Sequence, residues 1–109
     1  MTANQKRNSL KAARLYLEMR GHKLLEQGWS AGKYRIDLIT SKDGVVEFTH
    51  VSFAPEGSVS DVVESAKEIE KLKSASDFWL DANKYSGKHK LFRIELYGNG
   101  YQVLSFNDL

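Results

Sequence analysis

The sequence contains no cysteine and only one proline among its 109 residues. The absence of cysteine excludes disulfide bonds and thiolate chemistry, and it is compatible with a reducing compartment. No apolar run approaches the roughly 20 residues that a membrane-spanning helix needs. Residues 1–14 are polar and basic, unlike the apolar centre of a secretory signal. We therefore expect a cytoplasmic protein with no membrane partner.

Several motifs of enzymes and metalloproteins are also missing. The histidines at positions 22, 50 and 89 lack the spacing and the cysteine partners of a zinc site. No serine lies in a nucleophile-elbow pattern. The Gly-Asn-Gly segment at 98–100 precedes a strand pattern rather than a helix, so it predicts a turn and not a phosphate-binding loop.

What is present indicates a globular domain. The length suits one domain with one core, which we assign to residues 1–109. Hydrophobic residues make up 41% of the chain, and five Phe, five Tyr and two Trp supply large core side chains. Eight glycines and the single proline argue against a disordered, low-complexity chain.

The charge is unevenly distributed. Residues 1–42 hold nine Lys/Arg and three Asp/Glu, whereas residues 43–109 hold seven Lys/Arg and eleven Asp/Glu. A basic half can attract a phosphate backbone or an acidic partner. A solvated basic helix face is the simpler interpretation, and charge alone favours it.

Hydrophobic periodicity predicts an α/β protein with the element order α-β-β-β-α-β-β. Helices are expected near residues 5–20 and 59–84, the first with Asn8 or Ser9 as its N-cap and Gly21 just past its end. Asp43–Gly44 indicates a hairpin turn. The strands are expected over residues 22–29, 34–40, 45–53, 91–97 and 101–106. A sheet with helices packed on its faces buries such elements.

Strand alternation predicts which side chains share a face. In the second strand, one face is expected to hold Tyr34, Ile36 and Leu38, and the other Arg35, Asp37 and Ile39. In the third strand, one face is expected to hold Glu47, Thr49 and Val51, and the other Phe48, His50 and Ser52.

Four segments occur in an order typical of a known family. They are LEMRGHKLL at 17–25, YRIDLI at 34–39, VEFTHVS at 46–52 and FRIELYGNG at 92–100. With them the sequence resembles, over nearly its whole length, the YraN-like family of bacterial proteins, which is related to nucleases of the restriction-endonuclease superfamily. The resemblance implies a restriction-endonuclease-like fold, with a five-stranded mixed sheet flanked by two helices.

The resemblance also implies where a metal site would stand. In the family, the Asp of the IDLI strand and a Glu of the next strand bind a divalent metal, and a Lys two residues later assists the attacking water. Carried over, Asp37 matches the Asp, whereas His50 and Ser52 occupy the Glu and Lys positions. Arg35 stands where a further Glu is expected.

Phosphodiester cleavage needs an activated water and neutralised phosphate charge, which hard cations bound by carboxylates supply. The acid that family members carry on the first helix falls near Leu10 or Lys11. Of the expected set, only the carboxylate of Asp37 therefore remains. Asp37 and His50 form a two-ligand set that is too small for Mg²⁺ or Mn²⁺, so we expect no cofactor and no catalytic residue.

Two acids are alternative ligands. Glu47 points away from His50 unless a bulge intervenes, and Glu56 reaches the site only if the following loop folds back. The simpler interpretation of Asp37 is an ion pair with Arg35 or with His50.

Three functions stay open. The first is a nuclease-fold protein that binds DNA or RNA without cleavage, through Lys11, Arg14, Lys33 and Arg35. These belong to a wider basic set, of which only some members can share one face: Lys6, Arg7, Arg20 and Lys23 are the others. Trp29 or Tyr34 would add base stacking only if exposed. The second is an assembly module, as a homodimer or as a subunit beside a protein partner. The third is a divergent nuclease that depends on Mg²⁺ or Mn²⁺ and uses Asp37, His50 and a displaced acid.

Overall fold

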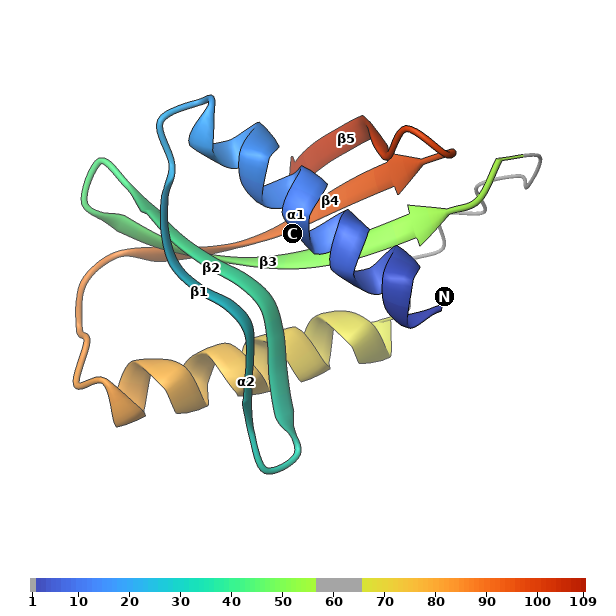
Figure 1. Ribbon diagram of the computed structural model, residues 1–109. Coiled ribbons are helices and arrows are strands. Elements are labelled where there is room, and N and C mark those ends of the chain that lie inside the picture. Colours follow the sequence, from blue (N-terminus) through green and yellow to red (C-terminus); the bar gives the residue numbers. More distant parts are fainter. Residues whose placement is uncertain (1, 57–65) are drawn as a thin grey trace.

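The computed structural model describes residues 2–56 and 66–109 (Figure 1). The predicted order of helices and strands is confirmed. The elements are α1 (Ala3–Glu18), β1 (Lys23–Ala31), β2 (Tyr34–Lys42), β3 (Val45–Ala54), α2 (Ala66–Ala82), β4 (His89–Tyr97) and β5 (Gln102–Asp108). The second predicted helix began at residue 59, and its part over 59–65 lies outside the described residues. No helix within the described residues is long and apolar enough to cross a membrane.

The five strands form one mixed sheet in the order β1-β2-β3-β4-β5. Neighbouring strands are antiparallel except β3 and β4, which are parallel. A parallel pair needs a crossover connection, and the segment that contains α2 supplies it. The predicted α/β class, with a five-stranded mixed sheet and two helices, is therefore confirmed.

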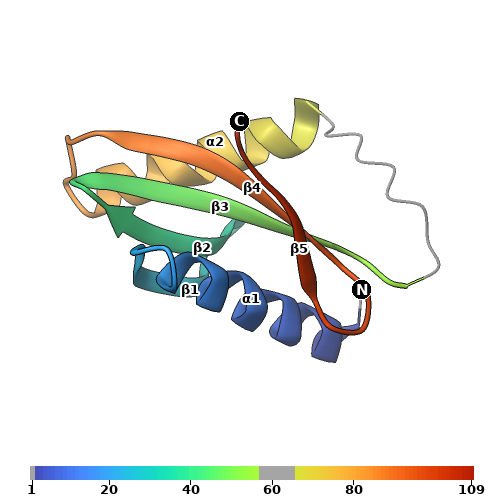
Figure 2. The same ribbon diagram turned by 90° about the horizontal axis from the view of Figure 1, so that it is seen from above.

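The two helices cover opposite faces of the sheet, as Figure 2 shows. On one face, Leu10 and Leu17 of α1 pack in a buried cluster with side chains of the sheet. On the other, Leu72 and Trp79 of α2 pack against Phe48 at the centre of the sheet. Each helix thus buries one apolar stripe, which explains why neither is hydrophobic all round.

The start of α1 differs from the prediction, since neither Asn8 nor Ser9 caps it. Thr2 is the N-cap: its Oγ1 accepts a hydrogen bond from the Gln5 backbone N–H (3.1 Å), and the Gln5 Oε1 accepts one from the Thr2 N–H (2.9 Å). This reciprocal pair is a capping box. It starts the helix at Ala3 and so fixes Lys6 in the first turns of a rigid element.

Strand β2 does not alternate as predicted. Ile36 and Ile39 both pack in the α2 cluster, whereas Leu38 packs in the α1 cluster. The strict alternation expected over residues 34–40 is therefore wrong, and the change of face falls at Asp37. The register of β2 with β3 runs from Leu38 to Lys42, whereas its register with β1 continues to Tyr34. Strands β2 and β3 thus separate at Asp37, while β1 and β2 stay paired.

The β1–β2 turn is shorter than predicted. Strand β1 continues through Ala31, which pairs with Tyr34, so only Gly32 and Lys33 make the turn. Gly32 has a positive φ of 58° that a glycine adopts at low cost. Figure 1 shows the hairpin extending past α2. The turn therefore carries Lys33 to the same side of the sheet as α2.

Candidate functional site

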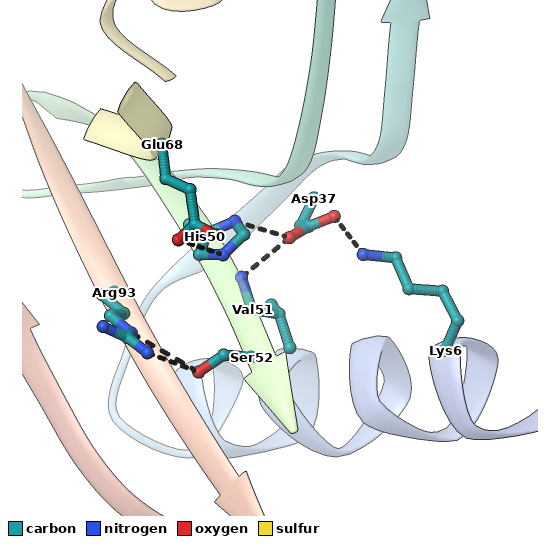
Figure 3. A network of polar contacts seen from close by, with 7 residues as sticks. All are labelled: Lys6, Asp37, His50, Val51, Ser52, Glu68 and Arg93. Carbon is teal, nitrogen blue, oxygen red and sulfur yellow. Dashed lines mark hydrogen bonds and ion pairs between the residues drawn. The ribbon is translucent and has the colours of Figure 1, made fainter. Parts of the chain in front are cut away.

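Asp37 is the centre of a polar cluster at the point where β2 leaves β3. Its side chain is 15% exposed, and its Oδ1 lies 2.6 Å from the Nζ of Lys6 on α1. Its Oδ2 accepts a hydrogen bond from the Val51 backbone N–H (2.8 Å) and lies 3.4 Å from the Nδ1 of His50. Figure 3 shows these groups converging on the carboxylate. Both oxygens of Asp37 are thus engaged by groups of the same chain.

The pKa of Asp37 lies below its ordinary value. Burial raises this pKa, but the hydrogen bonds to His50 and Lys6, the positive charge of Lys6 and the Val51 N–H together lower it by more. Each of these groups favours the ionised carboxylate. Asp37 is therefore a carboxylate at neutral pH.

This shift makes part of the stability depend on pH. Asp37→Asn should lower the free energy of unfolding at pH 7 by about 1–3 kcal/mol, because it removes the charge that Lys6 pairs with. A depressed pKa means that the ionised group stabilises the fold above its unfolded pKa, and that this contribution is lost as pH falls through the folded pKa. Urea denaturation at several pH values should show the difference between parent and variant shrinking below about pH 4.

A suitable control is Asp77→Asn, at an exposed position of α2. It should change the free energy of unfolding little at any pH. A difference for Asp37→Asn that stayed constant down to pH 2, or grew in acid, would contradict the assigned role of Asp37.

His50 and Ser52 extend the cluster along β3. The ring of His50 lies between two carboxylates, since its Nε2 is 3.9 Å from the Oε2 of Glu68 on α2. Ser52 accepts hydrogen bonds from Nε and Nη2 of Arg93 on β4, at 3.4 and 3.3 Å. Figure 3 places the predicted residues Asp37, His50 and Ser52 in one neighbourhood.

The main partner of Asp37 was not predicted. An ion pair with Arg35 or His50 was expected, and the His50 contact is present, but Lys6 makes the shortest contact. The acid expected near Leu10 or Lys11 has no counterpart there, because Leu10 is buried in the core and Lys11 is exposed. Lys6 stands four residues before Leu10 and therefore continues the sheet-facing stripe of α1. That spacing, with the Thr2–Gln5 capping box, is the signal that sequence reasoning missed.

Neither alternative acid joins the cluster. As alternation predicted, Glu47 points away from His50: its Oε1 lies 2.5 Å from the Nδ1 of His22 and accepts a hydrogen bond from the Thr40 hydroxyl (3.0 Å). All three of these side chains are buried. Glu56 is exposed in the loop after β3. The buried His22–Glu47 pair was not predicted, and it is a structural element of the sheet.

The residues around Asp37 do not fit a site for Mg²⁺ or Mn²⁺. Such cations need several oxygen ligands, whereas the oxygens of Asp37 already face the Lys6 ammonium and the Val51 N–H. An ammonium at that position repels a metal cation. Over residues 2–56 and 66–109, no group of three or more His, Asp or Glu side chains is placed to hold a metal ion.

A groove adjoins the cluster, between β2 and α2. It consists of two neighbouring cavities of about 420 and 670 Å³, both lined by Arg35 and Lys71. Its basic side chains come from α1, the β1–β2 hairpin and α2: Lys6, Lys33, Arg35, Lys67 and Lys71. Its acidic side chains are Asp37, Glu68 and Glu70. We call this surface the β2–α2 groove; its described lining has more cations than anions.

The predicted basic residues divide between two surfaces. Lys33 and Arg35 line the β2–α2 groove. Lys11 and Arg14 do not line it; the Arg14 Nε is 3.3 Å from Glu18, and its Nη1 donates to Gln27 (3.1 Å). Of the four residues predicted to bind nucleic acid, two therefore line the groove and two do not. Lys67 and Lys71 of α2, which were not included, complete the groove instead.

Comparison of the sequence with protein-family models and with curated proteins gives no match. A function has to be inferred from the polar cluster and from the β2–α2 groove themselves.

Proposed function

We propose that this protein is a degenerate member of the restriction-endonuclease-like superfamily, related to the YraN-like family, that binds nucleic acid without cleaving it. The observation that carries the proposal is the 2.6 Å contact between Lys6 and Asp37. The one carboxylate that matches the nuclease pattern is neutralised by a cation of the same chain. The fold identity is supported by the mixed sheet between two helices and by the position of Asp37, where two antiparallel strands separate.

The chemistry of the cluster argues against hydrolysis. A bound metal lowers the pKa of its water and holds the attacking and leaving oxygens. A lysine ammonium supplies positive charge, but it is not a Lewis acid that activates a water in this way. Ser52, at the position where the nuclease pattern has a lysine, is a neutral side chain bound by Arg93. The cluster therefore holds the fold together rather than activating water.

The β2–α2 groove supports the binding part of the proposal. Within it Asp37 is paired with Lys6, and Glu68 lies near His50. The remaining basic side chains, Lys33, Arg35, Lys67 and Lys71, lie along the same cavity as Glu70. Clustered cations of this kind bind phosphate backbones by releasing condensed counterions.

The test combines binding and cleavage on the same oligonucleotides. Fluorescence anisotropy at about 50 mM salt should show binding, since electrostatic contacts are strongest at low salt. Incubation with Mg²⁺ or Mn²⁺ should leave the labelled strands intact on a denaturing gel. Metal-dependent cleavage that Asp37→Ala abolishes would contradict the proposal and favour the divergent nuclease. Absence of binding to any oligonucleotide would favour the assembly module.

A further inference from the structure

Tyr34 lines the β2–α2 groove and belongs to a group of three neighbouring aromatic rings. Tyr34, which lines the groove, stacks on Phe78 of α2 with ring centroids 4.7 Å apart and planes at 22°. Phe78 also contacts Trp29 of β1 (6.1 Å) and remains 41% exposed. The Lys33 ammonium lies 5.4 Å above the Tyr34 ring. Aromatic and basic side chains thus lie next to each other at the groove.

This combination matches the two parts of an unpaired nucleotide. Bases stack on aromatic rings regardless of sequence, while the phosphates follow a positively charged groove. In a duplex the bases already stack on each other and are enclosed by two backbones, so a protein ring reaches them only after unstacking. Rings beside lysines therefore favour a single strand over a duplex.

The size of the groove also favours a single strand over a duplex. Its cavities of about 420 and 670 Å³ fall in the range of about 300–1,000 Å³ that is usual for small-molecule sites. Such cavities have room for an individual nucleotide, and a base enters one only when it is not paired and stacked inside a duplex.

We infer that the β2–α2 groove binds single-stranded nucleic acid, with phosphates at Lys33, Arg35, Lys67 and Lys71 and a base against the Tyr34 ring, which stacks on Phe78. This inference rests on the proposed nucleic-acid binding and adds the strandedness and the residues of the site. Lys33 then moves from above the Tyr34 ring toward a phosphate, and the incoming base covers the ring.

The test measures anisotropy with a labelled 12-nucleotide single strand and with a duplex of the same sequence. The single strand should bind about tenfold tighter or more. Lys33→Glu/Arg35→Glu should weaken single-strand binding by about tenfold or more. The matched control Lys11→Glu/Arg14→Glu makes the same charge change outside the groove and should have an effect below about threefold. Phe78→Ser leaves the net charge unchanged but removes the ring on which Tyr34 stacks, so it should weaken binding by about fivefold or more.

The outcomes separate this inference from the proposed function. Equal or tighter binding to the duplex would overturn the single-strand inference while leaving nucleic-acid binding intact, and so would an effect of the control pair larger than that of the groove pair. No binding to either oligonucleotide would overturn both. Thermal unfolding checks that each variant is folded, and Lys33→Gln/Arg35→Gln replaces the charge-reversal pair if that pair does not fold.

Discussion

Glu47→Leu is expected to lower the free energy of unfolding by about 2–6 kcal/mol, because two buried side chains, His22 and Thr40, lose the carboxylate that they contact, at about 1–3 kcal/mol for each buried polar group left without a partner. The Glu47 and His22 side chains are each 7% exposed, and their contact is 2.5 Å long. The Thr40 hydroxyl, which donates to the same carboxylate oxygen, would lose its acceptor as well. Urea denaturation at neutral pH measures the loss directly.

Two further variants serve as controls for the Glu47→Leu measurement. Glu47→Gln keeps a hydrogen-bonding side chain and should cost only about 1 kcal/mol, and Glu70→Leu, at an exposed position of α2, should change stability by no more than about 0.5 kcal/mol. Folded Glu47→Gln should bind oligonucleotides with the affinity of the parent. A Glu47→Leu protein as stable as the parent would contradict the structural role of Glu47. So would a metal-dependent activity that the parent has and that Glu47→Gln loses.

The fold could be predicted from sequence because its elements carry local signals. Periodicity gave their order, and the turn at Asp43–Gly44 followed from residue types that tolerate positive φ; the φ values there are 53° and 79°. The start of α1 was missed because Thr2 and Gln5 precede the apolar stripe by more than a turn. The change of face at Asp37 was missed because strict alternation assumes an unbroken ladder, and the β2–β3 register stops at Leu38.

The site was only partly predictable, for reasons of distance along the chain. His50 could be assigned near Asp37 because both belong to consecutive strands of one hairpin. Lys6 is 31 residues from Asp37, and only the packing of α1 on the sheet brings them together. The His22–Glu47 pair depends on the register of β1, which shifts at a bulge between Leu24 and Glu26 that no local sequence signal marks.

The charged part of the β2–α2 groove depends on tertiary packing in the same way. Lys33 and Arg35 belong to the basic N-terminal part of the sequence, whereas Lys67 and Lys71 belong to a part with more acids than bases. Summed charge along the chain therefore points to residues 1–42 and not to α2 as the basic surface. Only the placement of the hairpin beside α2 shows that cations from both parts line one cavity.

Salt should weaken binding of a single strand to the parent protein by about 50-fold between 50 and 200 mM. For single strands, each phosphate neutralised by a basic side chain contributes about −0.7 to the slope of log affinity against log salt. Four contacts, from Lys33, Arg35, Lys67 and Lys71, give a slope near −2.8, and a fourfold rise in salt at that slope gives the stated loss. Anisotropy titrations at four salt concentrations measure it.

The slope also counts the contacts that a variant removes. Lys67→Gln/Lys71→Gln should reduce its magnitude by about 1.4, because two phosphate contacts are lost and no charge is reversed. Lys11→Gln/Arg14→Gln, with the same change in net charge, should leave the slope unchanged because neither residue lines the groove. Equal changes in slope for both pairs of variants would mean that binding responds to net charge and not to a site. An unchanged slope for Lys67→Gln/Lys71→Gln would exclude α2 from the contact surface.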